Sequence, residues 1–202
     1  MDSMGSDSGP NAFIEIEHKF VVGRDFDHVK FVKNLAGMAP SRQASIHVRD
    51  TYFVISHDRR HVFRHRFDHE LQQLTVKSVE DDAAVRMEVN IPIDQSKGDQ
   101  RPAIAEFMKA LGCSWSGELA KDIQVAYFPD CEIVFYRAVN RDKTVCCVEF
   151  EAVNPGSVAE GLSVLAKYES ILGFKVEERE TKSLFELLLL DGAPGDIQAM
   201  FV

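Results

Sequence analysis

The chain lacks the features of a membrane protein, a secreted protein or a protein that binds duplex nucleic acid. Among its 202 residues, no uninterrupted apolar run reaches the ~20 residues that a transmembrane helix needs. Residues 1–10 are small and polar, without the basic and apolar regions of a secretory signal. The formal net charge of −9 argues against duplex binding, which depends on basic patches that neutralise phosphates. We therefore expect a cytoplasmic protein with neither a membrane nor duplex nucleic acid as a partner.

Cysteine is also scarce, and its spacing excludes two common kinds of site. The 4 cysteines form neither a disulfide framework nor the CxxC pairs of zinc sites, and without an export signal we expect them to be reduced. No internal repeat and no second composition regime is visible. We therefore expect one domain over residues 13–190, preceded by a disordered leader over 1–12 and followed by a loose tail over 191–202.

Strict alternation of charged and apolar residues in the run Ile14–Phe20 is the most informative feature that is present. A β-strand turns alternate residues to opposite faces, so the charged residues would share one face and the apolar residues the other. The charged residues of this run are Glu15, Glu17 and Lys19, and the apolar ones are Ile14, Ile16 and Phe20. A single strand of this kind could simply have a solvated face, as charged residues usually do.

The same alternation returns later in the chain, which changes the interpretation. It is found in Phe63–Phe67, Leu74–Lys77, Arg86–Ile91 and Val148–Ala152. Short polar turns between successive strands indicate antiparallel neighbours. Several strands with one apolar face and one densely charged face suggest a sheet that curls around a charged interior.

Helices and further strands complete the predicted α+β domain. Helices are expected near 26–35, near 102–111, after the capping box of Ser157 and Glu160, and over Leu184–Leu190. Strands are expected near 14–20, 45–55, 60–67, 71–78, 85–93, 123–128, 132–139 and 144–152, with turns at His57-Asp58-Arg59 and Asn140-Arg141-Asp142-Lys143.

The charges of the predicted interior indicate a ligand. Burying a charge costs several kcal/mol unless it is paired, hydrated or bound to a ligand. Guanidinium and ammonium groups match phosphate oxygens, whereas clustered carboxylates match hard cations such as Mg²⁺ or Mn²⁺. Both kinds of group are present on the charged faces, so together they suit a metal-bound polyphosphate. An acidic chain can still hold such a small polyanion in a locally basic pocket.

With these residues in place, the chain resembles the CYTH superfamily, the triphosphate tunnel metalloenzymes. The motifs that carry the resemblance extend from about residue 13 to about residue 190 in the expected order. They are Glu15-x-Glu17-x-Lys19, Asp50-Thr51-Tyr52, Arg64-x-Arg66, Leu74-Thr75-x-Lys77, Arg86-x-Glu88, Glu149-x-Glu151 and Lys182-Ser183-Leu184-Phe185-Glu186-Leu187-Leu188.

The resemblance implies an eight-stranded antiparallel β-barrel that forms a tunnel, with helices packed outside. It implies an enzyme for a small triphosphate, namely tripolyphosphate, thiamine triphosphate or ATP, with Mg²⁺ or Mn²⁺ as cofactor. The candidate metal ligands are then Glu15, Glu17, Glu88, Glu149 and Glu151. The candidate substrate-binding residues are Lys19, Arg64, Arg66, Lys77, Arg86 and Lys182. The candidate catalytic residues are Lys19, Arg66 and Lys77.

Several positions depart from the family pattern. A Lys-x-Arg pair that is usual after the middle helices falls on Asp122 and Gln124, with Lys121 one residue out of register. An aspartate of the family falls on Arg137, and a second glutamate after Glu88 is Asn90. These departures predict a weaker hold on the far end of a polyphosphate, and therefore poor use of bare tripolyphosphate.

Three functions remain open at this point. The leading hypothesis is a phosphohydrolase of an organic or inorganic triphosphate. An adenylyl cyclase is compatible with Asn90, although no marker of an adenine pocket is present. A triphosphate-binding module without turnover is motivated by Asp122, Gln124 and Arg137. Asp50 and Tyr52 either order the tunnel mouth or only the sheet, and the sequence leaves the oligomeric state open.

Overall fold

A computed structural model of the chain describes residues 12–55, 61–78, 84–141 and 143–201. The expected turn at His57-Asp58-Arg59, the leader up to residue 11, and Asp142 of the expected hairpin turn lie outside these residues. Residue 12 already belongs to the first strand, so the domain begins one residue earlier than expected.

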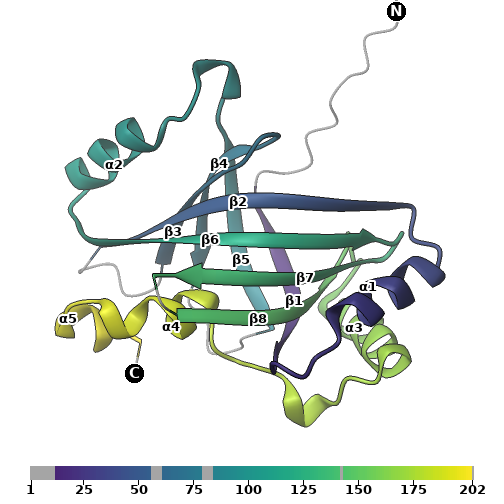
Figure 1. Cartoon of the computed structure of the whole chain (residues 1–202). Coiled ribbons are helices and arrows are strands. Elements are labelled where there is room, and N and C mark those ends of the chain that lie inside the picture. Colours follow the sequence, from purple (N-terminus) through teal and green to yellow (C-terminus); the bar gives the residue numbers. More distant parts are fainter. Residues whose placement is uncertain (1–11, 56–60, 79–83, 142, 202) are drawn as a thin grey trace, which may run out of the picture.

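The described residues form eight strands that close into one antiparallel barrel in the order β1-β5-β4-β3-β2-β6-β7-β8 (Figure 1). The strands are β1 (Ala12–Val22), β2 (Arg42–Ile55), β3 (His61–Phe67), β4 (Gln72–Ser78), β5 (Val85–Pro92), β6 (Cys113–Tyr127), β7 (Cys131–Asn140) and β8 (Lys143–Ala152). The predicted α+β class and the eight-stranded antiparallel barrel are confirmed.

Strand β6 is much longer than the sequence predicted, because it pairs with the long strand β2 over nearly its whole length. The pairing runs from Arg42 opposite Tyr127 to Ile55 opposite Cys113. Glycine and serine weaken strand propensity in the first half of β6, which hid that half from sequence analysis. Gly117 leaves room for the ring of Trp115, which would have to shift if a Cβ atom were present at this position.

Helices pack around the barrel, as expected. The helices are α1 (His28–Gly37), α2 (Arg101–Ala110), α3 (Val158–Leu172), α4 (Leu184–Leu188) and α5 (Gly195–Gln198), with 3-10 turns at Gln95–Lys97, Val176–Glu178 and Leu190–Gly192. Phe31 and Leu35 of α1 and Leu165 of α3 are buried in one cluster with Ile16 and Phe20 of β1. This contact holds the apolar face of β1 outward and therefore turns its charged face into the barrel.

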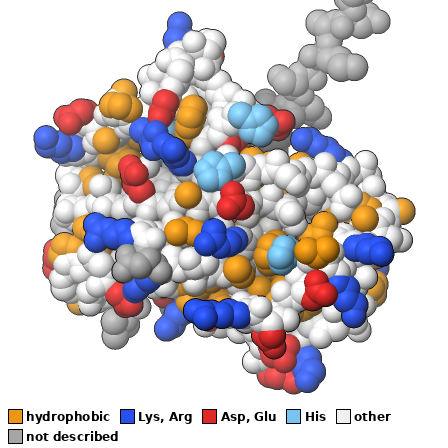
Figure 2. All heavy atoms as spheres, viewed as in Figure 1, with side chains coloured by type: hydrophobic (Ala, Val, Ile, Leu, Met, Phe, Trp, Pro, Cys, Tyr) orange, Lys and Arg blue, Asp and Glu red, His pale blue; other side chains and the backbone are white. Residues whose placement is uncertain are grey.

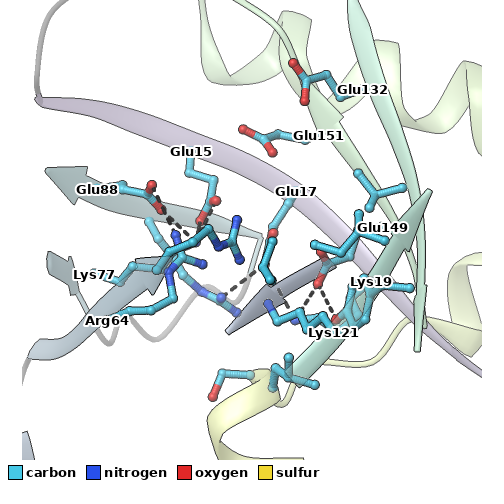
Figure 3. Close-up of a pocket in the computed structure, with 18 of the residues that line it drawn as sticks. Glu15, Glu17, Lys19, Arg64, Lys77, Glu88, Lys121, Glu132, Glu149 and Glu151 are labelled. Carbon is cyan, nitrogen blue, oxygen red and sulfur yellow. Dashed lines mark hydrogen bonds and ion pairs between the residues drawn. The ribbon is translucent and has the colours of Figure 1, made fainter. Parts of the chain in front are cut away.

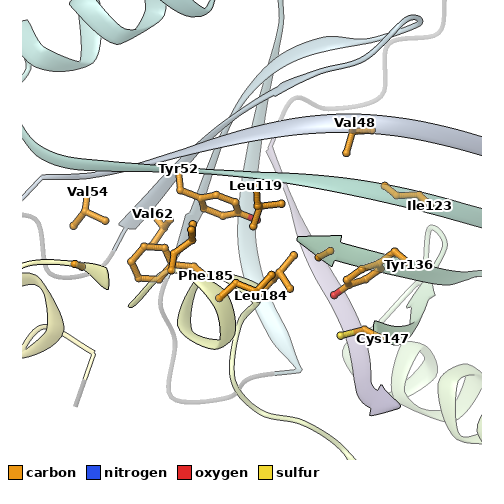
Figure 4. Packing of buried hydrophobic residues seen from close by; sticks show 14 of the residues in the cluster. Val48, Tyr52, Val54, Val62, Leu119, Ile123, Tyr136, Cys147, Leu184 and Phe185 are labelled. Carbon is orange, nitrogen blue, oxygen red and sulfur yellow. The ribbon is translucent and has the colours of Figure 1, made fainter. Parts of the chain in front are cut away.

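The C-terminal segment packs across one end of the barrel (Figures 1 and 4). Leu184 and Phe185 of α4 share a buried cluster with Tyr52 and Leu119. Ile197 of α5 belongs to the same cluster and is 0% exposed. The expected loose tail over 191–202 is therefore wrong as far as residue 201. Helix α5 of this tail is too short to be recognised from periodicity. Its packing on the α4 region supplies the stability that local helix propensity does not.

On the face of the molecule seen in Figure 2, Lys and Arg side chains are interspersed with Asp and Glu, so this face has no large patch of one charge. In the described part of the chain, no helix has both the length and the apolar character needed to cross a bilayer.

Packing of the C-terminal segment gives a prediction about stability. Ile197→Ala should lower the free energy of unfolding by about 2–5 kcal/mol, because it leaves a cavity in a buried cluster. Ile171→Ala on α3 is the matched control, since Ile171 is 58% exposed and should change stability by at most about 0.5 kcal/mol. Urea unfolding of both variants measures the difference. Equal stabilities would mean that the last residues do not pack on the barrel in solution.

Candidate active site

The barrel encloses a cavity of about 730 Å³ that is lined by residues from every one of the eight strands (Figure 3). All the candidate site residues from the sequence line it except Lys182. The residues brought together are Glu15, Glu17, Lys19, Arg64, Arg66, Lys77, Arg86, Glu88, Glu149 and Glu151. The prediction that the charged faces converge inside one barrel is therefore confirmed.

Lys182 is placed outside the cavity wall, with an exposed side chain. The cause is the capping box that starts α4: the Ser183 hydroxyl accepts from the Glu186 backbone N–H at 3.2 Å. This start directs Leu184 and Phe185 toward the barrel, and the residue before the cap then faces solvent. Its neighbours Thr181 and Ser183 line the cavity instead.

Lys77 binds two carboxylates at the centre of the cavity. Its Nζ lies 2.7 Å from Glu15 Oε1 and 2.6 Å from Glu88 Oε2. Burial would raise the pKa of Glu88, but Lys77 and Arg64 outweigh it and lower that pKa to about 2. Burial raises the pKa of Glu15 to about 7, since Lys77 offsets only part of it and the nearby Glu17 and Glu88 add repulsion. Glu15 is therefore the carboxylate of this group that is poorly compensated.

A second set of ion pairs connects β1 to β5 and β8. Arg86 Nη1 donates to Glu17 Oε1 at 3.1 Å, and Lys19 Nζ lies 3.6 Å from the same oxygen. Lys19 Nζ also lies 3.3 Å from Glu149 Oε1, which accepts from the Tyr136 hydroxyl at 2.8 Å. Each of these carboxylates is thus already paired with a cation of the protein.

Two carboxylates on the neighbouring strands β7 and β8 have no such partner. Glu132 and Glu151 face each other across the two strands, and neither forms an ion pair with any described residue (Figure 3). Burial, followed by the charges of Glu15 and Glu17, raises the pKa of Glu151 well above its ordinary value. Burial likewise raises the pKa of Glu132. This wall of the cavity therefore carries uncompensated carboxyl groups.

The donor set on this wall suits a hard divalent cation, because it consists of carboxylate oxygens. With the side chains where they are, no three His, Cys, Asp or Glu residues of the described chain converge on one point. Glu15, Glu17 and Glu149 are turned instead toward Lys77, Arg86 and Lys19. A bound ion would have to draw these carboxylates away from their present partners.

Strand β6 corrects the sequence interpretation by one residue. Lys121 and Ile123 line the cavity, whereas Asp122 and Gln124 lie on the outer surface in a groove with Arg137. The assignment of the family's cation pair to Asp122 and Gln124 was therefore wrong. So was the role given to Arg137, since the inward residue of β7 at this level is Tyr136. The direction of these side chains was inferred from register alone, and a slip of one residue reverses every face of a strand.

Sequence reasoning missed Tyr136 and Glu132, which line the cavity, and noted Lys121 only as a cation one residue out of register. Asp50, which it left between ordering the tunnel mouth and ordering the sheet, pairs with Lys121 at 2.9 Å. Asn90 was recognised as a departure, and its amide donates to Glu88 Oε1 at 2.8 Å inside the cavity. The register of β6 against β2 was the information needed for Lys121, and one sequence does not contain it.

Comparison with known proteins identifies the fold. No protein-family profile matches the chain, and no curated protein is detectably similar to it. The PH1012 protein of Pyrococcus horikoshii OT3 is 21% identical, with a TM-score of 0.71 over 86% of this chain and 99% of that one. A putative adenylate cyclase from Bacillus halodurans is 13% identical, with a TM-score of 0.62 over 87% and 97% of the two chains.

A third similar structure is a putative adenylyl cyclase from Hippeastrum that is described as having a dominant triphosphatase activity. It is 15% identical, with a TM-score of 0.59 over 90% of this chain and 98% of that one. At these identities the likeness establishes the fold alone. That fold is the one implied by the resemblance to the CYTH superfamily, and this expectation is confirmed.

The paired carboxylates give a prediction about pH. Burial would raise the pKa of Glu17, but Lys19, Lys77 and Arg86 lower it from 4.5 to about 2. The unfolded chain therefore binds more protons than the folded one between these values, and stability should be lost as the pH falls through this window. Glu17→Gln should flatten the loss by roughly 2–4 kcal/mol. Urea unfolding at pH 2.5, 4 and 6 measures it, and identical pH dependences in both proteins would contradict the pairing of Glu17.

Proposed function

We propose that this protein is a divalent-metal-dependent enzyme that processes a triphosphate, most simply as a phosphohydrolase. The supporting observation is that one cavity holds a set of paired cations beside a wall of poorly compensated carboxylates. A metal-bound triphosphate carries both of the charges that would satisfy these groups. The names of the similar proteins from Bacillus halodurans and Hippeastrum support a triphosphate as the substrate.

Binding of such a ligand would exchange partners within the cavity. Lys77 and Arg86 now donate to Glu15 and Glu17. If the carboxylates turned to a cation, the freed ammonium and guanidinium groups would meet phosphate oxygens instead, so each of these charges would keep an opposite charge beside it. These groups are already largely removed from solvent in the folded protein, so most of their desolvation cost would not arise again on binding.

The proposed roles follow from position in the cavity. Lys19, Arg66 and Lys77 would contact the phosphoryl groups at which charge develops, and Arg64, Arg86 and Lys121 would align the rest of the triphosphate. Glu15, Glu17, Glu88, Glu149 and Glu151 would hold Mg²⁺ or Mn²⁺, which supplies charge neutralisation and activation of a water molecule. The protein itself contributes positioning and fixed charges, which is the main demand of phosphoryl transfer.

An adenylyl cyclase is the second candidate, and Asn90 is the observation that favours it. Asn90 lines the cavity at a position where the family usually has glutamate, so one expected metal ligand is absent. Hydrolysis and cyclisation differ in their products, so one assay separates them.

The test is a panel of tripolyphosphate, thiamine triphosphate and ATP, each with Mg²⁺, Mn²⁺ or a chelator. We expect metal-dependent release of phosphate from at least one substrate, whereas pyrophosphate with cyclic AMP would favour the cyclase. The double variant Glu15→Gln and Glu149→Gln should lower kcat/KM by about a hundredfold or more, since it removes metal ligands. Asp122→Asn, on the outer surface, is the matched control and should leave kcat/KM unchanged.

If no product forms but calorimetry shows that a triphosphate binds, the protein is a triphosphate-binding module and not an enzyme. Absence of both turnover and binding would refute the proposed function.

The corrected register of β6 gives a further prediction. Lys121→Met should weaken the binding of tripolyphosphate by about tenfold or more, because it removes a cation from the cavity. The triple change Asp122→Lys, Gln124→Arg and Arg137→Asp should leave binding unchanged, since these residues lie outside. Isothermal titration calorimetry compares the two. Tighter binding by the triple variant would mean that Asp122, Gln124 and Arg137 face the cavity, as the sequence suggested.

A further inference from the structure

Asp50 differs from every other carboxylate near the cavity. Its side chain is 0% exposed and does not line the cavity, although Asp50 is on the same face of β2 as Val48 and Tyr52, which do. It sits on β2, between the two strands that carry its partners: Arg66 is directly opposite on β3, and Lys121 is on β6. The carboxylates of Glu15, Glu17, Glu88 and Glu149, in contrast, are on the cavity surface, where a ligand could take their place.

Three contacts engage both oxygens of Asp50. Arg66 donates from Nε to Oδ1 at 2.9 Å and from Nη2 to Oδ2 at 3.0 Å, and Lys121 Nζ lies 2.9 Å from Oδ2. The paired Arg–carboxylate contact fixes the plane of the guanidinium group as well as its position. One edge of Arg66 is thereby occupied, and the rest of the group remains directed at the cavity that Arg66 lines.

The charges around Asp50 explain why such an anchor is needed. Arg64 and Arg66 are on the same face of β3, and their two positive charges repel each other. Burial would raise the pKa of Asp50, but Arg66 and Lys121 outweigh it and hold that pKa far below its ordinary range. Asp50 is therefore ionised at neutral pH, and it is the counter-ion shared by cations from two strands.

We propose that Asp50 is a positioning residue: it fixes Arg66 and Lys121 in one orientation, so that their free donors meet a phosphoryl group without rearrangement. This inference rests on the proposed function, because it concerns the cations that would bind the triphosphate. Unlike the carboxylates on the cavity surface, Asp50 keeps its partners when the ligand binds. It stabilises the geometry of the site and touches neither substrate nor metal.

The first test is Asp50→Asn, assayed with the best substrate of the panel. Loss of orientation should lower kcat per active site by about a hundredfold, the cost expected when a reacting group is misplaced by about 1 Å. Ground-state affinity for tripolyphosphate should not fall, since the change also removes a negative charge near the bound anion. Calorimetric titration with tripolyphosphate counts the competent sites, so a partly unfolded preparation is not mistaken for a slow enzyme. A kcat per site within about threefold of the wild type would overturn the proposal.

Arg66→Lys serves as the second variant if Asp50→Asn does not fold. It keeps the positive charge but loses the paired contact with Asp50. We expect kcat per site to fall by about tenfold or more at unchanged affinity, and retention of kcat would overturn the proposal. Asp122→Asn is again the control, since Asp122 is the residue after Lys121 but faces the outer groove.

A second measurement does not depend on turnover. The Nε–H signal of Arg66, assigned by its absence in Arg66→Lys, should show slow solvent exchange in ¹H–¹⁵N spectra and should keep its position when tripolyphosphate is added. A signal that moves to that of a solvent-exposed guanidinium on binding would mean that Asp50 releases Arg66, and would overturn the inference. Failure of the proposed function is distinct, because it is seen in the wild type alone as the absence of triphosphate binding, and it would overturn this inference with it.

Discussion

Mutual neutralisation of buried charges is the constraint on which this structure depends. The barrel interior holds ammonium, guanidinium and carboxylate groups that would each cost several kcal/mol to bury alone. Lys77 between Glu15 and Glu88, and Glu17 between Lys19 and Arg86, reduce that cost by pairing. The pairs join strands that are far apart in the sequence, so the charges that prepare a site also specify how the barrel is assembled.

The carboxylates fall into two groups with different consequences. Glu17 and Glu88 are well compensated, and their pKa values are lowered to about 2. Glu15 and Glu151 are poorly compensated, and their pKa values are raised. The first group stabilises the folded protein, whereas the second keeps a part of the cavity in a state that a cation would relieve. The carboxylates of one cavity thus differ in how far the cations of the protein offset their charge.

Sequence reasoning succeeded where the alternation of charged and apolar residues was unbroken. The motif of Glu15, Glu17 and Lys19 gave its strand, its inward face and its place in the barrel, because one register fits both faces. It failed on β6, where Gly117 interrupts the strand pattern and the register placed Asp122 and Gln124 inward in place of Lys121 and Ile123. Asp50 could not be assigned either, since its role depends on two neighbouring strands that are adjacent only in three dimensions.

The C-terminal segment also determines how a ligand could be oriented in the barrel. Leu184, Phe185 and Phe201 line the cavity at the end where α4 packs, beyond the charged residues. A linear polyphosphate entering from the other end would meet these apolar side chains at the end of its path. The barrel would then admit the end of a polyphosphate chain but not the middle of a long polymer. In this arrangement α4 and Phe201 would limit the substrate to short or terminal triphosphates.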